Sequence, residues 1–130
     1  EWNKKITESL FNGAFTTLTD FGVKSDNIKR IDVPGSFELI FGSKKMIQSN
    51  VDVVIAIGCV IKGETEHFDY ICKSVSSAIV DLNINFDTPV VFCVLTDNNV
   101  QQSIDRSGGI HGNKGVEAAI TALKLANLKV

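Results

Sequence analysis

The hydrophobic positions of the chain form two patterns, continuous runs and helical repeats. One continuous run, VVIAI, covers residues 53–57, and a second, PVVFCVLT, covers residues 89–96. Continuous apolar runs rich in β-branched residues are typical of strands buried on both faces of a parallel sheet. Residues 28–33 instead alternate between two sets of positions, which predicts a short strand that ends at Pro34.

Helical spacing fills the segments between and after these strands. The first helix is predicted to begin at Thr7 and end at Gly22, and the second to begin with Ser36 as its cap. The inward positions expected for the five helices are, in chain order, Ile6, Leu10, Ala14, Leu18 and Phe21; Phe37, Ile40, Phe41 and Ile47; Ile71, Val75, Ala78, Ile79 and Leu82; Val100 and Ile104; and Val116, Ala119, Ile120 and Leu123.

The predicted order of elements is α, β, α, β, α, β, α, α over residues 1–130. This order indicates a single α/β domain in which a parallel sheet is flanked by helices on both faces. Three strands make a small sheet, and a helix is an unusual first element for this architecture. We therefore expect that the first strand of the sheet would precede residue 1 and is missing from this sequence.

Composition narrows the classes of function. The chain has 130 residues, is 44% hydrophobic and carries a formal net charge of −2 with both signs scattered along it. Such a charge gives no electrostatic reason to expect nucleic acid or a membrane as partner, so we expect local binding of small molecules. No apolar run approaches the roughly 20 residues that a bilayer requires, and no signal sequence opens the chain, so we expect a cytoplasmic protein.

The three cysteines, Cys59, Cys72 and Cys93, are odd in number and lack paired metal-ligand spacing. We interpret them as reduced thiols, and we expect no metal site. The known phosphate fingerprints are also missing, because the sequence contains neither a Walker A motif nor G-x-G-x-x-G after a strand. A G-x-S-x-G nucleophile motif is absent as well.

Candidate chemistry follows the run at residues 53–57, where the chain turns polar through GETEH at residues 63–67. Ligands of open α/β sheets bind beyond the carboxyl ends of the strands, so this loop is the expected site. A lone histidine is most often a cap or surface residue. At a helix N-terminus beside a ligand, however, a neutral His67 imidazole could accept a proton.

Three further residues allow a structural or a functional interpretation. Trp2 is either a packing residue or a platform that stacks on a flat ligand. Glu38 is either a carboxylate favoured by the helix dipole or an acceptor aimed at a ligand. Arg106 is either a solvated side chain or, beside the glycines of SGGIHGNKG and with Lys114 nearby, a clamp for phosphate. These residues together predict an α/β protein that binds a phosphorylated small molecule.

Five segments together resemble the lumazine synthase family and occur in the family's order between Trp2 and Leu128. They are VPGSFE at residues 33–38, GCVIKGETEHFDYI at 58–71, VVFCVLT at 90–96, IDRSG at 104–108 and GNKGVEAAITAL at 112–123. The resemblance implies a flavodoxin-like three-layer fold with a strand ahead of Trp2. It also implies a reaction that needs no cofactor. In that reaction 5-amino-6-(D-ribitylamino)uracil condenses with 3,4-dihydroxy-2-butanone 4-phosphate to give 6,7-dimethyl-8-ribityllumazine.

The resemblance also implies a role for each matching residue. Trp2 and Phe92 would be aromatic walls, Ser36, Phe37 and Glu38 would hold the ribityl chain and ring, and the backbone of Cys59, Val60 and Ile61 would read the uracil. Glu64 and Thr65 would form the phosphate turn, and His67 would transfer protons. Arg106 would clamp the phosphate, and Lys114 would be the substrate-binding lysine nearby. Glu64 departs from the family, which usually has alanine there, so we expect its side chain to face solvent.

Relatives in this family assemble into pentamers and often into hollow icosahedral shells. The short turn SGGIHGNK, residues 107–114, favours a shell, because family members that stop at pentamers commonly have a longer turn there. The resemblance further implies that each active site is shared between two subunits. Two alternatives stay open from the sequence, a flavin or phosphate binder without catalysis and a mainly structural shell protein of the same fold.

Overall fold

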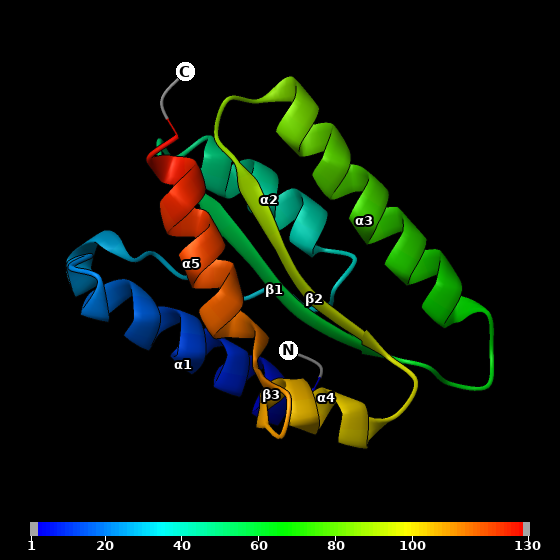
Figure 1. Ribbon diagram of the computed structural model, residues 1–130. Coiled ribbons are helices and arrows are strands. Elements are labelled where there is room, and N and C mark those ends of the chain that lie inside the picture. The colour runs from blue at the N-terminus through cyan, green and yellow to red at the C-terminus, as the bar shows by residue number, and fades with distance from the viewer. Residues whose placement is uncertain (1–2, 129–130) are drawn as a thin grey trace.

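A two-stranded parallel sheet forms the centre of the computed structural model, which describes residues 3–128 (Figure 1). The strands are β1, Val54–Ile61, and β2, Val90–Asp97, and they pair in register from Val54 with Val90 to Ile61 with Asp97. Both strands therefore end at the same edge of the sheet. This is the edge at which the sequence predicts a site.

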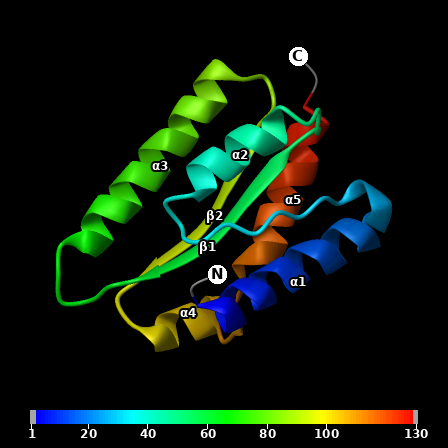
Figure 2. The ribbon, with the colours of Figure 1, turned by 180° about the vertical axis from the view of Figure 1, so that it is seen from behind.

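Helices cover both faces of this sheet, as Figures 1 and 2 show from opposite sides. Helices α1 and α5 lie on one face of the sheet, and α2 and α3 lie on the other. Helix α4 lies near the carboxyl ends of the strands. The bounds are α1 Lys4–Asp20, α2 Leu39–Ile47, α3 His67–Asn85, α4 Val100–Arg106 and α5 Lys114–Ala126. The three-layer α/β architecture predicted from the sequence is thus confirmed.

The core lies between the sheet and each layer of helices. Val75, Ile79 and Leu82 of α3 pack on one face of the sheet, while Leu10 of α1 and Ala122 of α5 pack on the other. A short 3₁₀ helix, Ser25–Asn27, follows α1, and a small hairpin of β3, Ser107–Gly109, and β4, Gly112–Asn113, joins α4 to α5. None of the described helices is both long enough and apolar enough to cross a bilayer.

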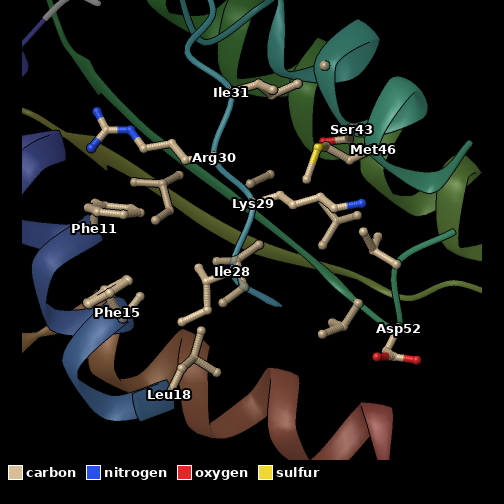
Figure 3. A pocket seen from close by; sticks show the side chains of 18 of the residues that line it. Phe11, Phe15, Leu18, Ile28, Lys29, Arg30, Ile31, Ser43, Met46 and Asp52 are labelled. Atoms are coloured by element: carbon tan, nitrogen blue, oxygen red, sulfur yellow. The ribbon is translucent and has the colours of Figure 1, made fainter. Parts of the chain in front are cut away.

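The prediction of a strand at residues 28–33 is wrong. This segment is not hydrogen-bonded as a strand, and β2 is the only strand that pairs with β1 among the described residues. A strand needs a neighbouring backbone, and here a cavity of about 990 Å³ separates the segment from β1. Figure 3 shows side chains of α1, of residues 28–31 and of α2 around this cavity. The expectation of a further strand ahead of the chain stays a prediction.

Several predicted inward positions are also wrong. In α2 the small residues Gly42 and Ser43 are buried, whereas Phe41 is 65% exposed and Phe37, ahead of the helix, is 48% exposed. Ser36 does not cap this helix, which begins at Leu39 without a side-chain cap. Four other residues that were predicted to face inward are also exposed, namely Phe21, Val100, Ile104 and Ile120. In α4 and α5 small residues, among them Ser103, Ala118 and Ala122, take the buried positions instead, and Phe21 lies at the end of α1.

Candidate active site

One group of predicted site residues gathers at the carboxyl end of β1. Cys59, Val60 and Ile61 are the last three residues of that strand, and the loop that follows is exposed, including Glu64 and Thr65. His67 is the first residue of α3 and is also exposed. No side chain caps α3. The positive end of a 19-residue helix therefore faces the same space as the imidazole.

The turn of Ser36, Phe37 and Glu38 reaches this edge because Gly58 leaves room for it. A Cβ at Gly58 would lie 3.0 Å from the Ser36 hydroxyl oxygen and 2.9 Å from Leu39 Cδ1. The turn, which is the loop ahead of α2, therefore packs directly on β1. Figure 2 shows this loop passing beside the strand. Phe37 and Glu38 are exposed and available to a ligand. The glycine of the GCVI segment thus has a packing role that places the VPGSFE turn.

Asn3 is a residue at this edge that the sequence did not single out. It has left-handed backbone geometry with a φ of 56°, and its side-chain amide donates a hydrogen bond to the Cys59 carbonyl oxygen at 3.2 Å. The contact fixes the start of α1 against the backbone expected to read the uracil. The sequence held no clear signal for it, because the first helix was predicted to begin at Thr7, whereas α1 begins at Lys4, directly after Asn3. Trp2 lies outside the described residues.

A second group, Phe92, Arg106 and Lys114, lines a different cavity of about 920 Å³ along the outer edge of β2. Phe92 is 42% exposed, although the strand that carries it is mostly buried. None of the residues in the first group lines this cavity within the described part of the chain. The structure therefore divides the predicted site between the end of β1 and the free edge of β2.

Of the predicted residues that the structure describes, two line the larger cavity between residues 28–33 and β1, namely Ser36 and Cys59. Much of its remaining lining is aliphatic or aromatic, with Phe11, Phe15 and Leu18 contributed by α1 (Figure 3). The polar groups needed for the reaction lie mainly elsewhere. We therefore place the candidate site at the carboxyl edge of the sheet rather than in this cavity.

Two carboxylates accompany the cations of the second group. The Lys114 ammonium donates to both carboxylate oxygens of Glu117, at 2.7 and 2.8 Å. Arg106 Nη1 donates to the Gln102 carbonyl oxygen at 3.1 Å, and Arg106 Nε lies 3.9 Å from Asp97 Oδ1. A phosphate bound here would compete with Glu117 for Lys114. Sequence reasoning missed Glu117, although its spacing three residues after Lys114 on a helix was the available signal.

The cysteines are free thiols, as predicted. Burial raises the pKa of Cys59 and raises that of Cys93 to about 12, so both are protonated near neutral pH. Neither is therefore a thiolate nucleophile. Among residues 3–128 no group of three or more potential metal ligands comes together. The available chemistry is proton transfer, hydrogen bonding, stacking and phosphate binding.

Comparison with known proteins gives one family. A family model described as 6,7-dimethyl-8-ribityllumazine synthase matches residues 1–130. The chain is 64% identical to the 6,7-dimethyl-8-ribityllumazine synthase of Flavobacterium johnsoniae, with 99% of this chain and 68% of that protein covered. It is 61% identical to the enzyme of the same name from Flavobacterium psychrophilum, with 99% and 69% covered. It is 59% identical to that of Christiangramia forsetii, with 99% and 78% covered.

Proposed function

Because the chain belongs to the 6,7-dimethyl-8-ribityllumazine synthase family and is a transferase of riboflavin biosynthesis, we propose that two copies of it build each active site together. The enzyme condenses 5-amino-6-(D-ribitylamino)uracil with 3,4-dihydroxy-2-butanone 4-phosphate to give 6,7-dimethyl-8-ribityllumazine. The observation that supports the shared site is the separation of the predicted residues into two groups. Each group by itself lacks part of what the reaction needs.

The first group supplies the binding site for the pyrimidine and the proton-transfer residue. We assign the ring and ribityl chain to Trp2, Ser36, Phe37 and Glu38, and the uracil edge to the backbone of Cys59, Val60 and Ile61. The second group supplies Phe92 as an aromatic wall and Arg106 with Lys114 as phosphate ligands. The backbone of Glu64 and Thr65 completes the phosphate turn, with the Glu64 side chain left in solvent.

Association of two copies would join these groups. Large apolar side chains are exposed close to the first group, including Phe37 and Tyr70, and the outer edge of β2 carries the second group. Exposed apolar surface of this kind marks an interface, because burying it is favourable. A neighbour whose β1 end approached this edge of β2 would place its His67 near Arg106 and Phe92.

The chemistry suits residues of this kind. Attack of the amine on the ketone, loss of phosphate from the resulting imine and ring closure each require a proton to move, and one imidazole can serve in both directions. Holding two reactive substrates in line lowers the barrier further, by roughly 7–11 kcal/mol in favourable cases. His67 therefore assists the reaction, while most of the rate comes from proximity. The reaction proceeds without a cofactor.

Incubation with both substrates tests the reaction. We expect the purified, assembled protein to form the fluorescent lumazine product without an added cofactor and in the presence of a metal chelator. A relative such as the Flavobacterium johnsoniae enzyme, assayed in parallel, shows that the substrates are competent. Absence of product from this protein beside an active relative would contradict the proposal and favour a binding or structural role.

We also propose that the assembly is a closed ring of five copies, that such rings pack into an icosahedral shell, and that the protein is cytoplasmic. The short β3–β4 hairpin between α4 and α5 supports the shell, since it offers little to obstruct packing between rings. Sedimentation of the protein is expected to give a particle much larger than a pentamer. A profile of pentamers alone would contradict the shell.

A further inference from the structure

We infer that Asp97 is a positioning residue for Arg106: its buried carboxylate, held by Ser103, orients the guanidinium that binds the substrate's phosphate. The inference rests on the proposed function, because it assumes that Arg106 binds phosphate. Asp97 is the last residue of β2, and Ser103 and Arg106 both belong to α4. The three residues thus connect the end of the central sheet to the phosphate cavity.

Asp97 is held by a directed series of hydrogen bonds. The fully buried Ser103 hydroxyl donates to Asp97 Oδ2 at 2.7 Å, and the Cys59 thiol donates to the Ser103 oxygen at 3.4 Å. Burial keeps the Cys59 thiol protonated, so it is a donor and leaves the Ser103 hydrogen for the carboxylate. One carboxylate oxygen is therefore fixed by buried groups from β1 and α4. A buried carboxylate held in this way has little freedom to move.

The other oxygen faces the guanidinium of Arg106. Asp97 Oδ1 lies 3.9 Å from Arg106 Nε, which is too long for a hydrogen bond but close enough for attraction between the charges. On the opposite side Nη1 donates to the Gln102 carbonyl oxygen at 3.1 Å. No hydrogen-bond partner is found for Nη2 within residues 3–128. The two contacts thus restrain Nε and Nη1 and leave Nη2 available to a phosphate.

Removing the Asp97 charge has two opposing effects on phosphate binding. It removes a nearby negative charge, which favours binding, and it frees the guanidinium, which must then be ordered again when phosphate binds. Arg106 is about one-third exposed, so water screens the repulsion between the carboxylate and a phosphate beyond the guanidinium. We therefore expect the loss of order to dominate. Ordering one long side chain corresponds to roughly a 3- to 10-fold change in affinity.

Asp97→Asn tests this directly, because it keeps the size of the side chain and removes the charge. We expect the KM for the phosphorylated substrate to rise about 3- to 10-fold, with kcat and the KM for the pyrimidine within about twofold. The inhibition constant of inorganic phosphate should rise in parallel. Asp105→Asn is the matched control, since Asp105 precedes Arg106 directly but bonds to the Gln101 amide at 2.8 Å. That control should change none of these constants beyond about twofold.

A double-mutant cycle separates positioning from general damage to the fold. If Asp97 acts through Arg106, Asp97→Asn raises the KM no further in a chain that already carries Arg106→Ala. A purely structural role would add its effect in both backgrounds. Ser103→Ala gives a second test in case Asp97→Asn folds poorly, because it loosens the carboxylate without removing its charge. It should raise the same KM by a smaller factor.

The outcomes distinguish the inference from the function on which it rests. If Arg106→Ala leaves the KM for the phosphorylated substrate unchanged, the phosphate assignment fails and the inference fails with it. If Arg106→Ala raises that KM while folded Asp97→Asn and Ser103→Ala leave it unchanged or lower it, only the inference is overturned. The inference is also overturned if Asp97→Asn raises the KM for the phosphorylated substrate by the same factor in the Arg106→Ala protein as in the parent protein.

Discussion

Gly115→Ala is expected to destabilise the fold, because Gly115 of α5 packs directly against the backbone of α1 at Leu10. A Cβ at this position would be 1.9 Å from the Leu10 carbonyl oxygen and 2.7 Å from its carbonyl carbon. Unbonded atoms of these kinds stay more than about 3 Å apart, so the helices would have to separate by roughly 1 Å. The obstacle is backbone, which cannot rotate aside as a side chain can.

The size of the effect follows from two opposing terms. Overpacking costs typically about 1–3 kcal/mol, and a backbone obstacle belongs at the upper end of that range. Alanine is a better helix former than glycine by at most about 1 kcal/mol. The net loss is therefore about 2 kcal/mol, which lowers the melting temperature of a domain of this size by roughly 5–10 °C.

Thermal unfolding followed by circular dichroism measures this loss. Gly63→Ala is the matched control, because no atom lies within 4 Å of the added Cβ and its stability should stay within about 0.5 kcal/mol. A Gly115→Ala protein that melts with the parent protein would show that α1 and α5 are not packed as described. Such a result would also remove the basis for the position of Lys114, the residue before Gly115.

Three further predictions concern the site and a buried thiol. Arg106→Ala should raise the KM for the phosphorylated substrate roughly 10- to 100-fold with little change in kcat, as expected for loss of a charged hydrogen bond; steady-state kinetics with an unchanged KM would exclude the phosphate role. His67→Ala should keep measurable activity, with kcat lowered by no more than about 10²-fold, and complete loss in a folded protein would mean that proton transfer dominates. Folding raises the pKa of Cys93 from 9.0 to about 12, so its stabilising contribution is complete below pH 9 and is lost as the pH rises toward 12. Unfolding by denaturant across this pH range should therefore show a smaller loss of stability in Cys93→Ala than in the parent protein, and parallel curves would contradict the shift.

The sequence predicted the elements that carry a strong and complete pattern. Residues 53–57 and 89–96 are continuous apolar runs, and they lie at β1 and β2, the two strands of the parallel sheet. His67 was expected in the first turn of a helix and is the first residue of α3. These features depend on local composition and periodicity, which can be read directly from the sequence. The arrangement of helices on both faces then follows from the alternation of strands and helices.

Features that depend on distant neighbours were not predictable from the pattern. Residues 28–33 alternate as a strand does, but strand formation needs a neighbouring backbone, and a cavity lies there instead. Phe41 has the spacing of an inward residue and is exposed, because the smaller Gly42 and Ser43 take the buried positions of α2. Periodicity alone does not say which of several adjacent residues a helix turns toward the sheet.

The contacts within the candidate site show the same limit. The hydrogen bond of Asn3 to Cys59 joins residues 56 positions apart, and that of Ser103 to Asp97 joins the end of a strand to a helix. Neither pair is marked by any motif in the sequence. The resemblance to a family supplied the residue roles and the expectation of a shared site, whereas the cavity along β2 that Phe92, Arg106 and Lys114 line is visible only in the structure.

Mixed assembly of two variants tests the shared site most directly. His67→Ala and Arg106→Ala subunits are refolded together in equal amounts, and activity is measured over a range of concentrations of the phosphorylated substrate. If each site takes His67 from one subunit and Arg106 from its neighbour, random assembly around a ring leaves roughly a quarter of the sites intact. The mixture should then show a component with the parent KM and the parent rate that neither variant has alone. Activity equal to the plain average of the two variants would show that each site is built within one subunit.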